Sequence, residues 1–176
     1  MNKNIIQIFP KSFMLKDNVL EDELKKYEDF CLSNQNKTLK SSILHVNSSY
    51  DYLPQLNKLD LFSSLSSFIL KSAKEYARGT EYASRRVKDC IRERMRFKTS
   101  DKGDFLFPHI HNGCLFSGVF YIKTQEENVI LFHDENKNIY ANPDKPTEYS
   151  QFIIPVKCIP GRLLMTIADE GCCNSP

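Results

Sequence analysis

The fold is decided by the stretch FLFPHIHNGCLFSGVFYI, residues 105–122. It contains two apolar runs of strand length, Phe105–His111 and Leu115–Ile122. Similar runs occupy the rest of the second half, separated by turn-forming clusters such as Ser100–Gly103 and Asn142–Pro146. Runs at this spacing predict an antiparallel sandwich or barrel. The other four runs are Met95–Lys98, Val129–Phe132, Gln151–Lys157 and Arg162–Ile167.

The first half of the chain has helical periodicity instead. Apolar residues at three- and four-residue steps predict a helix over Val19–Leu32, and Asn18 with Glu21 has the form of a capping box. A second helix is predicted from Lys58 to Gly79, a residue that suits a left-handed helix end. Its apolar face comprises Leu61, Leu65, Phe68, Ile69 and Tyr76.

Two further segments precede the second helix. Met1–Pro10 is predicted to form a first strand, and Ser33–Asn57 a surface connection with one short strand at Ile43–Val46. Helices followed by strands predict one α+β domain over residues 1–176, with 1–94 mainly helical and 95–176 forming a β core. We expect Leu61, Leu65, Phe68 and Ile69 to be buried against Val119, Tyr121 or their same-face neighbours.

Composition narrows the class of protein. The 176 residues are 41% hydrophobic and 26% charged, which is typical of a folded soluble protein. A net charge of +2 gives no global field for nucleic acid, and no apolar run is long enough to span a bilayer. We expect a cytoplasmic, non-secreted protein, because no leader pattern is seen and the cysteines lack CxxC spacing. The six cysteines, expected to be free thiols, are Cys31, Cys90, Cys114, Cys158, Cys172 and Cys173.

The two histidines of the central stretch form a candidate metal site. On a strand, His109 and His111 point to the same face, so their imidazoles can converge on one ion. An HxH pair is also compatible with two solvated or core histidines at a strand end. The surrounding sequence favours the metal site.

Residues 102–123 resemble the metal-site hairpin of a family of 2-oxoglutarate/Fe(II)-dependent oxygenases found in bacteria and bacteriophages. The resemblance continues through Val129–Asp134 and Pro160–Met165, and more weakly back to Ile5. It implies a double-stranded β-helix, a jelly-roll core with N-terminal helices packed on one sheet. It also implies Fe(II) and 2-oxoglutarate as cofactors.

The resemblance assigns roles to single residues. It implies that His109 and His111 begin the ligand set, with Asp134 as a further candidate and His133 as its alternative. Ser117 and Tyr121, on the next strand, are candidates for binding the cosubstrate carboxylate. Iron held by two histidines and a carboxylate leaves positions open for the keto acid and O₂.

The C-terminal segment departs from the family pattern. An ungapped count places Cys172 where the family has its distal histidine, and a thiolate from Cys172 or Cys173 would shift metal preference toward zinc. The family's later strand, which carries a carboxylate-binding arginine, is not found, and the candidate substitutes are Arg162, Arg94 and Arg96. Both departures put the two cofactors in question and predict a poor oxygenase or none.

Two other functions are compatible with the sequence. One is a non-catalytic binding or virion-associated structural protein on the same fold, with an assembly partner. The other is nucleic-acid binding through the basic segment Arg78–Lys98, which is less favoured because few aromatic residues interleave its cations. Neither the substrate nor the oligomeric state follows from the sequence.

Overall fold

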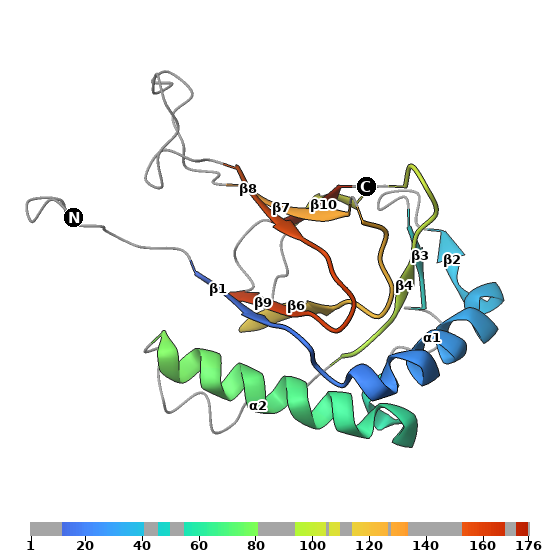
Figure 1. Cartoon of the computed structure of the whole chain (residues 1–176), viewed down its shortest axis with the longest axis horizontal. Coiled ribbons are helices and arrows are strands. Elements are labelled where there is room, and N and C mark those ends of the chain that lie inside the picture. The colour runs from blue at the N-terminus through green and yellow to red at the C-terminus, as the bar shows by residue number, and fades with distance from the viewer. Residues whose placement is uncertain are drawn as a thin grey trace, which may run out of the picture.

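The structure is a computed structural model that describes residues 12–40, 46–49, 55–80, 94–104, 106–109, 114–126, 128–133, 153–167 and 172–175. It confirms the α+β class, with two α-helices and several antiparallel sheets, none of which is closed. Figure 1 shows two sheets facing each other, with a long helix below the lower one. The strands predicted at Met1–Pro10 and over most of Ile43–Val46 lie outside the described residues.

The helical elements occupy the predicted parts of the first half. The α-helices are α1 (Leu24–Ser33) and α2 (Ser63–Gly79). Short 3₁₀ turns flank them: η1 (Glu21–Glu23), η2 (Gln35–Lys37), η3 (Leu56–Lys58) and η4 (Asp60–Phe62). The first helix therefore begins later than predicted, because η1 occupies its expected first turn.

The predicted capping box at the start of the first helix is wrong, whereas the predicted end of the second helix is confirmed. Asn18 does not cap a helix: its φ is 57°, that of Leu20 is 49°, and no side chain caps η1 or α1. The chain turns sharply in the left-handed region between residues 18 and 20, so the helix starts after that turn. At the other end, α2 finishes at Gly79 as predicted, but Thr80 is the C-cap and Gly79 does not adopt positive φ.

Ten described strands form three antiparallel sheets. One sheet has the order β1-β9-β6, a second β5-β10-β7-β8, and a third, made of two-residue strands, β2-β3-β4. The strands of the two larger sheets are β1 (Phe13–Lys16), β5 (Leu106–His109), β6 (Phe116–Phe120), β7 (Val129–His133), β8 (Ile153–Lys157), β9 (Leu163–Ile167) and β10 (Cys172–Ser175). Those of the third are β2 (Leu39–Lys40), β3 (Asn47–Ser48) and β4 (Lys98–Thr99).

Five predicted strands are confirmed with small shifts, as β5, β6, β7, β8 and β9. In the two larger sheets, two strands were not expected: β1, which comes from the helical half of the chain, and β10 at its C-terminal end. The run Met95–Lys98 forms only a bridge at Met95 and the start of β4. Helices and strands are therefore not divided strictly at residue 94.

The strand pairs of the second half are nested. β7 pairs with β8, β6 with β9, and β5 with β10, all antiparallel. The chain crosses from one large sheet to the other at every connection except that between β7 and β8. The second half is thus a long hairpin folded over on itself, with the chain entering and leaving through β5 and β10.

Alternation along β9 separates the two faces of its sheet. Leu163 and Met165 pack with Tyr76, Phe68 and Ile69 of α2, while Leu164 belongs to the core between the sheets. Helix α2 therefore covers the outer face of this sheet (Figure 1). The predicted contact of α2 with Val119 or Tyr121 is wrong, because these residues alternate onto the other face of the sheet. The apolar residues of β6 that pack near α2 are Phe116 and Phe120.

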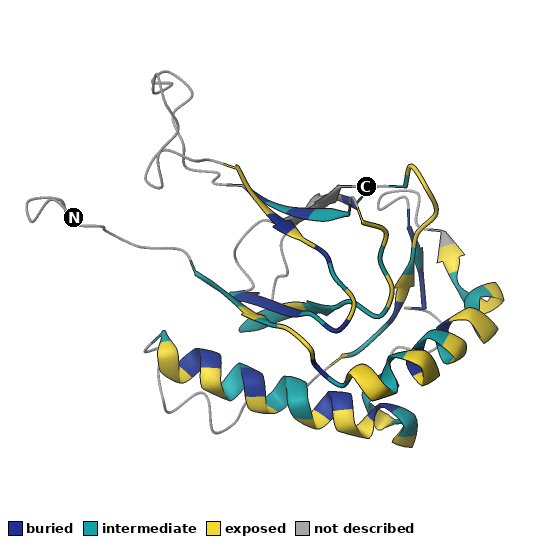
Figure 2. Cartoon of the chain, viewed as in Figure 1, coloured by how far each residue is buried: buried dark blue, intermediate teal, exposed yellow. Residues whose placement is uncertain are grey.

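Buried residues lie on strands of both large sheets (Figure 2). The ring of Phe13 in β1 stacks on that of Phe132 in β7, with centroids 4.9 Å apart. Ile130, Val156 and Leu164 are buried in the same cluster. These contacts join β1 and β9 of one sheet to β7 and β8 of the other.

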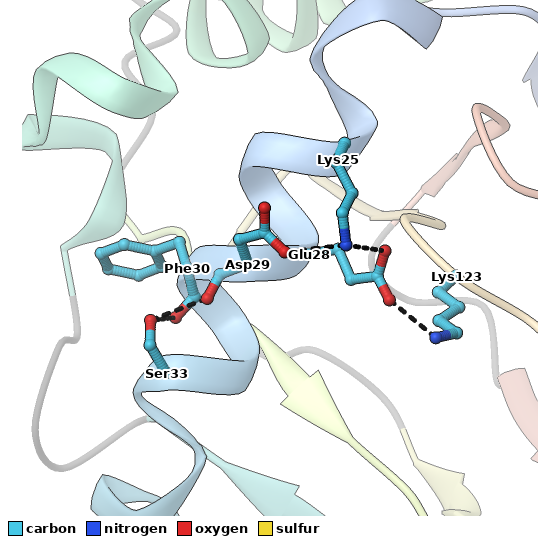
Figure 3. Close-up of polar contacts among 6 residues, drawn as sticks. All are labelled: Lys25, Glu28, Asp29, Phe30, Ser33 and Lys123. Carbon is cyan, nitrogen blue, oxygen red and sulfur yellow. Dashed lines mark hydrogen bonds and ion pairs between the residues drawn. The ribbon is translucent and has the colours of Figure 1, made fainter.

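A separate aromatic core holds α1. Tyr27 is fully buried, stacks on Phe62 at 5.1 Å and donates a hydrogen bond to Glu23. On the solvent side of α1, Lys123 from the segment after β6 binds Glu28 at 2.7 Å (Figure 3). Helix α1 is thereby attached to the end of the sandwich at which β6 finishes.

No helix in the described part of the chain is long and apolar enough to cross a membrane.

Candidate metal centre

Two strands far apart in sequence carry the candidate ligands. The register of β5 and β10 pairs His109 with Cys172, and Cys172 is also the partner of Phe132 in β7. Directly opposite residues in an antiparallel ladder have Cα atoms about 4.5–5.5 Å apart. The backbone positions of His109 and Cys172 are therefore as close as two metal ligands on neighbouring strands require.

The remaining metal candidates, His111, His133 and Asp134, lie at or just after the ends of β5 and β7 in the sequence. β5 ends at His109, β7 ends at His133 and β10 begins at Cys172, so all three termini lie at one end of the sheet. We call this the β5–β10 end. His111 and Asp134 lie outside the described residues.

The facing sheet contributes two hydroxyl residues at the same end. Ser117 of β6 is the register partner of Thr166 of β9, and both alternate onto the inner face with Leu164. Thr166 is buried, and Phe13 is its partner on the other side. Sequence reasoning did not single out Thr166, although it is the only polar residue in the run Leu163–Ile167.

Tyr121 and Arg162, the other cosubstrate candidates, lie at the opposite end of the sandwich. The backbone N–H of Tyr121 donates to the carbonyl oxygen of Arg162 at 3.0 Å. Since each is four residues along its strand from Ser117 or Thr166, about 13 Å separates the two pairs. The structure thus brings Ser117 toward His109 and Cys172 but does not bring Tyr121 and Arg162 there.

Arg162 is already bound to a carboxylate. Its Nε and Nη2 donate to the two carboxylate oxygens of Asp17 at 2.5 and 2.7 Å, and its Nη1 donates to the carbonyl of Lys157 at 2.6 Å. Hydrogen bonding to Arg162 lowers the pKa of Asp17. A keto acid would have to displace Asp17 to use this guanidinium.

We expect Asp17→Asn to destabilise the fold by about 0.5–1 kcal/mol, because it removes the charged partner of Arg162 from an ion pair whose carboxylate side chain is 42% exposed. Since the folded-state pKa of Asp17 is lowered, this stabilisation is present above the unfolded pKa of about 3.9 and is lost as pH falls through the folded value. Urea unfolding at neutral and acidic pH measures the difference. Asp22→Asn, at an exposed carboxylate in η1, is the control; an equal loss in both variants would contradict the assigned role.

Of the three cysteines whose side chains the structure describes, Cys114 is exposed, whereas Cys31 and Cys158 are buried. Burial raises the pKa of Cys31 to about 12. Burial also raises the pKa of Cys158, against a hydrogen bond from Tyr121 that lowers it. Both carry free thiols, as predicted, and both are buried away from the β5–β10 end.

The donor chemistry at the β5–β10 end fits a divalent transition metal. Imidazole and thiolate together suit Zn(II), Co(II) or Fe(II), and a thiolate favours zinc among them. Within the described residues, no three histidine, cysteine, aspartate or glutamate side chains gather into a complete site. The set proposed below therefore draws on His111 as well.

Comparison with models of known protein families finds no match to this chain, and none of the curated proteins matches it.

Proposed function

We propose that this chain is a metal-binding protein on a double-stranded β-helix, related in plan to the 2-oxoglutarate/Fe(II)-dependent oxygenases. The observation that carries the proposal is the nested pairing, with β5 and β10 as the outermost pair. A jelly roll is a long hairpin rolled in this way into two facing sheets. The pairing places the candidate first and distal ligands, His109 and Cys172, directly opposite each other.

The proposed ligand set is His109, His111 and Cys172, with Asp134 as a fourth candidate. Iron, when bound to such a set, would supply oxidation of 2-oxoglutarate by O₂. The residues around it would hold and shield the ligand: Ser117 can donate a hydrogen bond to a carboxylate, and the stacked rings of Phe13 and Phe132 exclude water from the interior.

Oxygenase turnover is proposed to be weak or absent. Productive turnover requires a cation to hold the far carboxylate of the keto acid. Arg162, one candidate for that role, lies about 13 Å along the sandwich and is paired with Asp17. A binding or structural role on the same fold is therefore the second candidate function.

Metal titration tests the proposal. The full chain is expected to bind one Co(II) or Zn(II) per molecule, and His109→Ala, His111→Ala and Cys172→Ala should each weaken binding at least tenfold, or about 1.4 kcal/mol. Cys173→Ala is the matched control, since Cys173 is the next residue on β10 and pairs with Leu131 instead of Phe132. Equal affinity in the Cys172 and Cys173 variants would contradict the assignment.

Release of succinate from 2-oxoglutarate with Fe(II) and O₂ tests turnover separately. We expect little release from the folded, metal-loaded chain. Rapid release abolished by His109→Ala would contradict the proposal of weak turnover and show an active oxygenase. Cys173→Ala serves as the control here as well, because Cys173 pairs with Leu131 and not with Phe132.

A further inference from the structure

One edge of the two large sheets differs from the others. Edge strands usually carry charges or proline, which prevent pairing with another chain. β1 has Lys16, β5 has Pro108, and β8 has both Pro155 and Lys157. β6, whose sequence is Phe-Ser-Gly-Val-Phe, has neither charge nor proline.

The outer edge of β6 also presents backbone groups. Among the described strands, only β9 pairs with β6, and Gly118 is exposed although it lies at the middle of the strand. Because the N–H of Tyr121 points to β9, alternation directs the N–H and C=O groups of Ser117 and Val119 to β9 as well. Those of Phe116, Gly118 and Phe120 are directed to the outer edge.

We propose that this edge pairs with β6 of a second copy of the chain, antiparallel about a two-fold axis at Gly118. The sequence is nearly symmetric about that residue, so Phe116 meets Phe120 of the partner subunit and Ser117 meets Val119 of the partner subunit. A two-fold interface requires such a self-complementary surface. An edge strand with charges or proline would pair with its own copy less stably, because like charges would lie opposite each other or a backbone hydrogen bond would be lost.

The symmetric register uses every outward-facing backbone group. Phe116, Gly118 and Phe120 form hydrogen-bonded pairs with the partner strand, which gives about six hydrogen bonds. Gly118 brings two backbones together where no side chain intervenes. The result is one continuous sheet of the order β1-β9-β6 followed by the same strands of the partner in reverse.

Sedimentation of the full chain and cysteine cross-linking test this inference together. The wild type is expected to be a dimer that dissociates on dilution. In the symmetric register, residues 117 and 119 form non-hydrogen-bonded pairs with Cα atoms about 4.5 Å apart, within the range of a disulfide. The double variant Ser117→Cys/Val119→Cys should therefore form a reducible covalent dimer under mild oxidation.

The single variants are matched controls. In each, the two introduced thiols lie on a diagonal at about 7–8 Å, so neither variant should cross-link beyond the wild-type background. A monomer at all accessible concentrations overturns the proposal, and so does cross-linking of the single variants as strong as that of the double variant. Slow amide exchange at Phe116, Gly118 and Phe120 in a monomer would also overturn it, because another segment of the chain would then cover the edge.

Discussion

Leu164→Ala is expected to lower the free energy of unfolding by about 2–5 kcal/mol. Leu164, the second residue of β9, is 1% exposed and is buried in one cluster with Ile130, Phe132 and Val156 of the facing sheet. Truncation removes the buried methyl groups and leaves a cavity that two sheets, each held by its own ladder, cannot easily close. Since domains are stable by about 5–15 kcal/mol, the loss is a large part of the total.

Urea unfolding followed by circular dichroism measures this loss. Leu32→Ala is the control, because Leu32 lies on α1 and is 50% exposed, and it should change stability by at most about 0.5 kcal/mol. Leu163→Ala, at the neighbouring buried residue, should instead weaken the contact with α2 and speed amide exchange in that helix. A Leu164→Ala loss as small as that of the control would contradict the face-to-face packing of the two sheets.

Phe62→Ala is expected to cost about 3–5 kcal/mol. Phe62 is 2% exposed at the end of η4, and its ring stacks on Tyr27 and meets Phe30 edge-on at 5.1 Å. The substitution removes the ring that links α1 to the start of α2. Both helices should therefore lose protection from amide exchange while the sandwich keeps it.

Thermal unfolding and site-resolved exchange measure this second effect. Leu39→Ala is its control, since Leu39 is 52% exposed. We expect the control to leave exchange in α1 unchanged. Uniform loss of protection across helices and sheets in the Phe62 variant would contradict a separate helical core.

Parts of the fold with one buried face could be predicted from sequence. The apolar stripe of α2 predicted that helix because the period of 3.6 is present along it, although α2 begins at Ser63 and the turns η3 and η4 occupy the predicted start at Lys58. The face on which β6 meets α2 could not be predicted. Leu115–Ile122 is apolar on both faces, since one lies between sheets and the other lies under a helix, so alternation gives no signal.

Short strands at the ends of the chain were missed for a different reason. β1 has only three apolar residues before Lys16, too few to distinguish a strand from a helix, and β10 is the run Cys-Cys-Asn-Ser, which has no apolar alternation. Each forms because it pairs with strands distant in sequence: β1 with β9, and β10 with both β5 and β7. Such pairing depends on tertiary context and not on local propensity.

The candidate metal site could also be predicted only in part, because its residues come from strands that are distant in sequence. The spacing of His109 and His111 indicated a metal site. The further ligand Cys172 came only from the resemblance, because an ungapped count along the family pattern reaches this residue at the distal histidine position. The register now places Cys172 opposite His109, but whether these residues bind metal stays a prediction. The ion pair of Arg162 with Asp17 could not be predicted, because the two residues are 145 positions apart.

The absorption spectrum of the Co(II)-loaded chain tests the central claim most directly. A thiolate bound to Co(II) gives a ligand-to-metal charge-transfer band in the near ultraviolet. With His109 and Cys172 in one site, the wild type and Cys173→Ser should show this band at one equivalent of Co(II), and Cys172→Ser should lose it. A folded wild type without the band, or a band that survives in Cys172→Ser, would contradict a metal centre built between β5 and β10.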